Sequence, residues 1–257
     1  MAKKGETSHT KRLAIPKAIP IYNKKEYKFI MSTNPGTHPK AKAIPLGVLI
    51  RDVLCITKSA SETRKVLNAK QVFVDNVIRK DERFPIGLMD LIFFPKVGKA
   101  YQIVLNTKGQ LIPVETKHVN SKIGKIVKKH VIKKGKINIT LHDGRNIIAD
   151  NNICVGDSII ITVPEQKIDN ILKFEKGAKC LVTEGKHIGS IANLESLVER
   201  KEGSGGQEAK LKGKEEFITA AKYLMVINEF YHDYSLLQSE DKTQTENKTQ
   251  SENKGAS

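Results

Sequence analysis

Apolar residues after position 43 recur at helical spacing and predict two short helices. The first helix is expected over residues 45–54, where Pro45 stands at the start of the pattern. Ser59 and Glu62 are spaced as a capping box, in which each residue satisfies a free backbone N–H of the other, and predict a second helix over residues 59–68. The two helices follow each other closely enough to belong to one small module.

The pattern then changes from helical spacing to strand alternation. Residues 71–80 alternate like a short hairpin, with Asn76 at a turn position that needs a positive φ. A further strand is expected over residues 88–94. We therefore predict a helix–helix–hairpin module that occupies residues 43–100.

Beyond residue 100 the pattern up to Val163 consists of strands and turns. Asp143-Gly144 lies between two alternating segments and is a hairpin signal. The expected strands are residues 101–105, 110–114, 137–141, 146–149 and 158–163. Residues 122–136 carry seven lysines and no acid, and we interpret them as a lysine loop. A central antiparallel β domain is predicted over residues 101–172.

The chain ends in a third small unit and a polar tail. Strands are expected at residues 178–182 and 223–227, with a Gly/Lys/Glu loop at residues 201–214. This unit spans residues 173–234. Residues 235–257 have almost no apolar side chain, so they cannot bury a core and are expected to be disordered.

The N-terminal segment, residues 1–42, concentrates positive charge and proline. It contains ten Lys/Arg and two Glu, without a helical period. We predict an extended basic arm that orders on a partner, although residues 15–21 are apolar enough to pack somewhere. With the other segments, the sequence predicts an α+β multidomain protein.

Composition narrows the kinds of partner. The 257 residues include 44 Lys/Arg against 28 Asp/Glu, a formal charge of +16, which favours a polyanion. No apolar run approaches the roughly 20 residues that span a bilayer, and the N-terminus does not resemble a signal peptide. Aromatic residues make up 5% and tryptophan is absent, which favours phosphate and shape recognition over base stacking.

Three scattered cysteines argue against a metal site. Cys55, Cys154 and Cys180 lack paired zinc spacing and suit reduced, mostly buried thiols in a cytoplasmic protein. No metal, cofactor or small-molecule substrate is therefore expected.

Two groups of residues indicate that the protein binds RNA. In the helix–helix–hairpin module, Arg64 and Lys65 of the second helix and Arg79 and Lys80 after the hairpin are expected to form one convex basic face. Such an arrangement is typical of an alpha-L RNA-binding motif. Considered alone, each pair of cations would be interpreted as ordinary solvent-exposed charge on its helix or hairpin. Glycines around a strand–turn–strand at residues 176–189 resemble the KOW motif of small barrels.

In their order along the chain, these parts resemble the small-subunit ribosomal protein four family of archaea and eukaryotes (the e-type). The stretches that carry the resemblance are residues 9–16, 35–39, 44–46, 51–54, 74–76, 79–81, 84–90, 141–146 and 185–189. The resemblance covers roughly residues 1–230. It implies an N-terminal segment, an alpha-L module, a central β domain and a C-terminal KOW/SH3-like β-barrel, docked on small-subunit ribosomal RNA. Lys70, Asn76 and Ala192 stand where the family usually has glycine.

The resemblance implies a structural constituent of the cytoplasmic ribosome, with ribosomal RNA and neighbouring small-subunit proteins as partners. If about eight phosphates are neutralised, log affinity should fall with log salt at a slope of roughly −6 to −7. The expected RNA-contacting residues are Lys3, Lys4, Lys11, Arg12, Lys17, Arg51, Lys58, Arg64, Lys65, Arg79, Lys80, Lys128, Lys129, Lys133, Lys134, Arg145, Lys186 and His187.

Two other classes remain as alternatives. An RNA-modifying enzyme with an appended alpha-L module would need a catalytic domain, and turns account for Asp143 and Asp157 without catalysis. Incubation with RNA followed by nucleoside analysis would detect it. A KOW-bearing transcription factor would co-purify with polymerase and sediment away from ribosomes.

Overall fold

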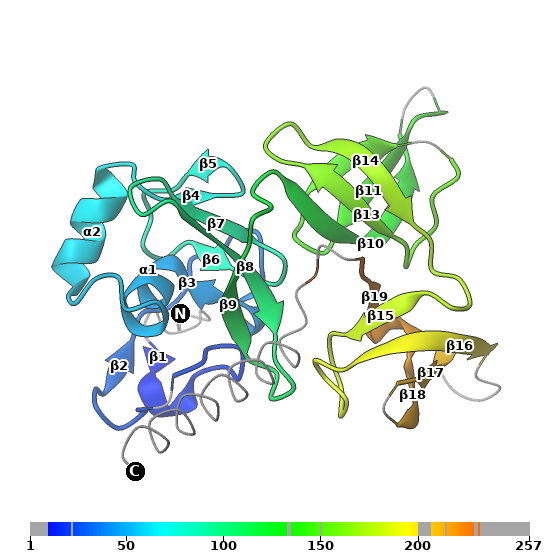
Figure 1. Ribbon diagram of the computed structural model, residues 1–257, viewed down its shortest axis with the longest axis horizontal. Coiled ribbons are helices and arrows are strands. Elements are labelled where there is room, and N and C mark those ends of the chain that lie inside the picture. Colours follow the sequence, from blue (N-terminus) through cyan, green and yellow to red (C-terminus); the bar gives the residue numbers. More distant parts are fainter. Residues whose placement is uncertain are drawn as a thin grey trace, which may run out of the picture.

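The computed structural model describes residues 10–21, 23–132, 135–149, 151–199, 207–213, 215–228 and 231. This part of the chain contains three five-stranded sheets and few helices, which confirms a multidomain, β-rich architecture. Each sheet forms a separate unit, with the first on the left of Figure 1, the second at the upper right and the third at the lower right.

The first unit has the predicted helix–helix–hairpin order. Its elements are β3 (Ile44–Pro45), α1 (Leu46–Val48), η3 (Leu49–Val53), α2 (Ala60–Asn68), β4 (Phe73–Val74), β5 (Val77–Ile78), β6 (Pro85–Ile86), β7 (Leu91–Phe94), β8 (Lys99–Leu105) and β9 (Leu111–Glu115). The capping box is confirmed, because Ser59 Oγ accepts from Glu62 N at 3.2 Å and Glu62 Oε2 accepts from Ser59 N at 3.3 Å. Asn76 has a φ of 59°, as predicted, and Asp75 before it has 50°.

The sheet of the first unit continues past the predicted boundary at residue 100. Its order is β5-β4-β7-β8-β9, and Leu91 of β7 pairs with Gln102 of β8. The boundary expected from the sequence therefore falls inside β8, and the unit extends to Glu115. The boundary was placed where the sequence pattern becomes strands and turns alone, but β8 and β9 pair with β7 and so belong to the first sheet.

The described part of the N-terminal segment is folded onto the first unit, which corrects the prediction of an extended arm. It forms β1 (Thr10–Lys11), η1 (Arg12–Ala14), β2 (Phe29–Ile30) and η2 (Lys40–Lys42). Ile15, Ile19 and Ile21 are buried in the core of that unit, so the predicted packing of residues 15–21 is confirmed. Residues 1–9 lie outside the described part.

The second unit is an antiparallel sheet in the order β12-β11-β10-β13-β14. Its strands are β10 (Ser121–Val131), β11 (Ile137–Leu141), β12 (Asn146–Ala149), β13 (Ser158–Thr162) and β14 (Lys167–Leu172). The lysine-rich segment is mostly strand β10 and not a loop. The Asp143-Gly144 turn joins β11 to β12 as predicted, with Gly144 at a φ of 80°.

The third unit is a sheet in the order β18-β17-β16-β15-β19. It contains β15 (Lys179–Val182), β16 (Ile191–Glu199), β17 (Gln207–Lys212), β18 (Glu216–Ala220), η5 (Ala221–Tyr223) and β19 (Leu224–Val226). Strand β17 lies within the segment predicted as a loop, because Ala209 and Leu211 are buried in the core. Ala192 is a regular, buried position of β16. The predicted polar tail, residues 235–257, lies outside the described part.

The three units share one apolar centre. Met89 and Val104 of the first unit, Ile123 of the second, and Leu181 and Met225 of the third belong to a single buried cluster. Such packing fixes the units against one another, because separating them would expose this surface to water.

Candidate nucleic-acid interface

Seven of the expected RNA-contacting residues are exposed lysines without an ion pair to another described residue. They are Lys11, Lys17, Lys58, Lys65, Lys80, Lys128 and Lys186. The first five belong to the first unit, Lys128 to strand β10 and Lys186 to the third unit. Their ammonium groups are therefore available to phosphates.

The arginines of the expected set are held by the protein itself, which corrects their proposed availability. Arg12 is 5% exposed and donates to Asn23 O at 2.9 Å. Arg79 is half-buried, and its guanidinium lies 4.4 Å from the centroid of the Phe84 ring. The side chain of Arg145 is 14% exposed and forms ion pairs within the protein.

Arg64 and Arg51 are bound by neighbouring carboxylates. Arg64 is exposed but donates to both Glu82 oxygens, at 2.9 and 3.0 Å. This ion pair raises the pKa of Arg64 and ties α2 to the segment after the hairpin. Arg51 donates to Asp52 at 2.7 and 2.9 Å. The predicted basic face therefore presents lysines, while Arg64 neutralises Glu82 and Arg79 lies against Phe84.

The remaining expected residues divide between internal contacts and the undescribed segments. Lys129 donates to Asn151 O at 2.9 Å, and His187 stacks on Phe217 with ring centroids 4.2 Å apart. Lys3, Lys4, Lys133 and Lys134 lie outside the described residues.

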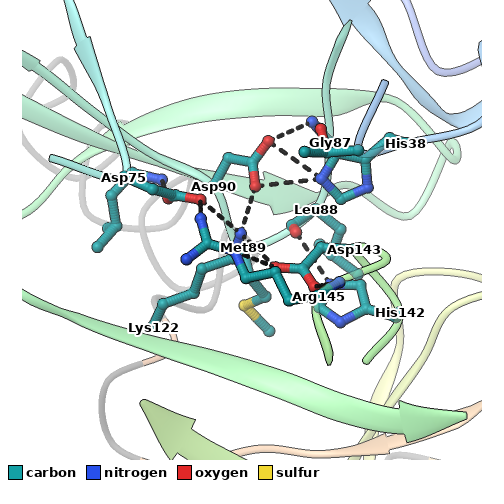
Figure 2. A network of polar contacts seen from close by, with 12 residues as sticks. His38, Asp75, Gly87, Leu88, Met89, Asp90, Lys122, His142, Asp143 and Arg145 are labelled. Carbon is teal, nitrogen blue, oxygen red and sulfur yellow. Dashed lines mark hydrogen bonds and ion pairs between the residues drawn. The ribbon is translucent and has the colours of Figure 1, made fainter. Parts of the chain in front are cut away.

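A buried charged cluster lies where the first and second units meet (Figure 2). Lys122 of β10 is its centre, with a side chain that is 1% exposed. Its Nζ lies 2.9 Å from Asp75 Oδ2, 2.6 Å from Asp90 Oδ1 and 3.0 Å from Asp143 Oδ2. Arg145 bridges Asp75 and Asp143 beside it.

Burial and charge oppose each other in this cluster. Burial alone would lower the pKa of Lys122, but the surrounding carboxylates outweigh it and hold that pKa above its usual value. Burial alone would raise the pKa of Asp90, yet the charges of His38 and Lys122 hold it below its usual value. Lys122 and Asp90 are therefore charged, and each depends on the other.

Two histidines flank the cluster. His38 Nε2 lies 3.1 Å from Asp90, and the ring packs so closely on Gly87 that a Cβ there would lie 2.4 Å from its Cγ. His142 Nδ1 accepts from Lys125 N, so its Nε2 carries the proton and donates to Leu88 O. Burial lowers the pKa of His142 to about 4, so the ring is neutral.

This cluster joins two units and was missed by sequence reasoning. Asp75, Asp90 and His38 belong to the first unit, whereas Lys122, Asp143 and Arg145 belong to the second. Charged residues usually indicate exposure, and Lys122 stands in a run that looks solvated. One signal was present: the participating side chains except Lys122 lie in the stretches that carry the family resemblance.

The described residues include no group of His, Cys, Asp and Glu that could hold a metal ion. Cys180 is buried, whereas Cys55 and Cys154 are exposed, which corrects the expectation of mostly buried thiols. None of the helices in the described segments is long and apolar enough to cross a membrane.

Comparison with known proteins gives consistent matches. The ribosomal family S4e matches residues 97–168. Small ribosomal subunit protein eS4 of Methanosphaera stadtmanae is 36% identical over 231 residues, covering 89% of this chain and 95% of the relative. The corresponding protein of Archaeoglobus fulgidus is 37% identical over 222 residues, covering 86% and 93%.

A solved structure agrees with these matches. The crystal structure of the 30S ribosomal protein S4e from Thermoplasma acidophilum is similar with a TM-score of 0.63 and 29% identity. The match covers 73% of this chain and 95% of that one. These matches define a class of ribosomal proteins, which are structural rather than enzymatic. Within that class, the chain belongs to the S4e family.

Proposed function

We propose that this protein is a structural constituent of the small ribosomal subunit in the cytoplasm and binds ribosomal RNA mainly through lysine–phosphate contacts. The observation that carries the proposal is the distribution of exposed, unpaired lysines over all three units. The relatives from Methanosphaera and Archaeoglobus carry the name of a small-subunit protein. Small-subunit ribosomal RNA and neighbouring small-subunit proteins are the partners.

The first unit acts as an alpha-L module in this proposal. Two helical segments followed by the β4–β5 hairpin support that assignment. Lys58, Lys65 and Lys80 are its phosphate ligands, because they are exposed and free of ion pairs to described residues. Arg64 and Arg79 support this face from within the protein, because Arg64 binds Glu82 and Arg79 packs on the Phe84 ring.

The third unit acts as a KOW-like barrel that presents Lys186. Gly185 and Gly189, both within the β15–β16 connection, have φ values of 95° and 77°. A Cβ on Gly189 would lie 2.4 Å from Asn106 O of the first unit. Glycine is therefore required there for close approach between the third and first units.

A charge-reversal pair tests the proposal. Lys65→Glu with Lys80→Glu should weaken binding to small-subunit ribosomal RNA at least tenfold, about 1.4 kcal/mol, because two attractions become repulsions. The reversal of Arg64 and Arg79 is a poorer test, since Arg79 is partly buried against Phe84. Binding is measured by filter retention at fixed salt, with melting temperature as the folding control.

The matched control makes the same change in charge elsewhere. Lys167 and Lys212 are exposed but lie beside Glu165 and Glu216, at 2.5 and 3.9 Å. Lys167→Glu with Lys212→Glu should cost less than about threefold, since neutralised cations release few counterions. Equal losses in both double variants would contradict the proposed face. A nearly flat salt dependence of the wild-type protein would contradict phosphate binding altogether.

A further inference from the structure

The N-terminal segment presents the exposed aromatic side chains of the described chain. Of the aromatic residues described, Tyr27 and Phe29 alone are exposed, at 62% and 47%. Tyr27 lies in the loop that leads into β2, and Phe29 is the first residue of that strand. Large apolar rings are usually covered in a folded protein, so the exposure of Tyr27 needs an explanation.

One face of the Tyr27 ring is backed by a fixed cation. The Arg12 guanidinium lies 5.4 Å from the ring centroid. Arg12 is itself buried, donates to Asn23 O at 2.9 Å and pairs with Glu26 at 3.5 Å. The guanidinium occupies one face of the ring, and the exposure of the residue leaves the opposite face accessible.

Lysines surround these rings on the chain. Lys24, Lys25 and Lys28 are exposed, and none of them has an ion pair with a described residue. Glu26, the one acid among them, is engaged by Arg12. An aromatic face flanked by unpaired cations suits a nucleotide, whose base stacks while its phosphates meet ammonium groups.

We propose that Tyr27 stacks an unpaired base of RNA on its open face, while Lys24, Lys25 and Lys28 contact the adjoining phosphates. This inference rests on the proposed function as an RNA-binding protein and adds a site of different chemistry. A base in a duplex is already covered by its neighbours, so the site selects single-stranded nucleotides. Arg12 is a positioning residue that holds the ring.

The absence of tryptophan provides a direct test. Tyr27→Trp introduces a single indole whose fluorescence falls when a base stacks on it. The full-length variant is titrated with a short oligoadenylate and with an RNA duplex of equal phosphate number. We expect the emission to fall by more than half with oligoadenylate and by much less with the duplex. Val131→Trp, at a position 70% exposed in lysine-rich β10, should respond weakly to both.

Affinity gives the second readout. Tyr27→Ala should weaken oligoadenylate binding about tenfold, whereas Tyr27→Phe, which keeps the ring, should bind like wild type. Oligoadenylate binding without quenching of the introduced indole, or an equal loss in both variants, overturns the stacking site but leaves the phosphate-binding function standing. A protein that binds neither oligoadenylate nor ribosomal RNA overturns both.

Discussion

Strand β10 contains two kinds of lysine. Near its beginning, Lys122 is buried among three carboxylates at the junction of two units. Farther along the same strand, Lys128 is exposed and without an ion pair to any described residue. The difference follows from pairing, because residues 121–125 lie against β13, whereas Lys128 pairs with Thr140 of β11. A lysine of one strand can thus either stabilise the fold through buried ion pairs or remain exposed for a ligand, depending on the strands that lie beside it.

Removing the buried lysine should give the largest effect. Lys122→Met leaves three carboxylates facing one another with Arg145 as their remaining permanent cation. We expect a loss of about 3–5 kcal/mol in the free energy of unfolding, because an uncompensated buried charge is costly. Lys128→Met should change it by less than about 0.5 kcal/mol. Urea unfolding followed by circular dichroism measures both, and similar losses would remove the distinction between the two lysines.

Lowering the pH should destabilise the buried junction between the first and second units. The folded pKa of His142 is about 4, below its ordinary value of 6.5, so the unfolded chain binds a proton between these pH values that the folded chain does not. Stability should therefore fall by about 3 kcal/mol as pH drops from 7 to 4. Below that range, the lowered pKa values of Asp90 and Asp143 extend the loss.

His142→Gln removes this titration and should flatten the dependence of stability on pH. His130→Gln, at an exposed position on β10 away from the junction, serves as the control for the loss of an imidazole. Thermal melts in buffers from pH 4 to 8 give the comparison. An unchanged slope in His142→Gln would assign the acid sensitivity to another group.

The smallest effect concerns an exposed lysine with a strained backbone. Lys70 has a φ of 57° and follows Ala69, the C-cap of α2, at the position where glycine is favoured. Lys70→Gly should raise the free energy of unfolding by about 0.5–1 kcal/mol. Lys80→Gly removes a cation without relieving a positive φ and should not stabilise. A loss of stability in both variants would show that the Lys70 side chain contributes contacts to the fold.

Local signals were readable in the sequence wherever adjacent residues determine the structure. The Ser59–Glu62 capping box and the turns at Asn76 and Asp143-Gly144 depend on hydrogen bonds or φ angles a few residues apart. The apolar character of residues 15–21 likewise predicted their packing. The capping box and the turns were confirmed because no distant partner is needed to specify them, whereas for residues 15–21 the pattern predicted burial without naming the core that buries them.

Features specified by distant partners were missed or misplaced. Strand β17 contains more charged than apolar residues, and only its pairing with β16 and β18 makes it a strand. Arg12, Arg79 and Arg145 look like phosphate ligands until Tyr27, Phe84 and Asp75 are brought beside them. The sequence therefore predicted that the chain has a basic RNA-binding surface. Which of its lysines and arginines are exposed and unpaired could be determined only from the fold.

The buried junction also bears on how the chain meets a long ligand. Because Lys122 and its carboxylates fix the second unit against the first, the proposed contact of one unit with RNA would hold the other near its own phosphates. The second contact then occurs at a local effective concentration that can reach the millimolar range. In that proposal, a set of individually weak lysine contacts would act as one multivalent attachment, whose strength depends on a cluster centred on a buried lysine.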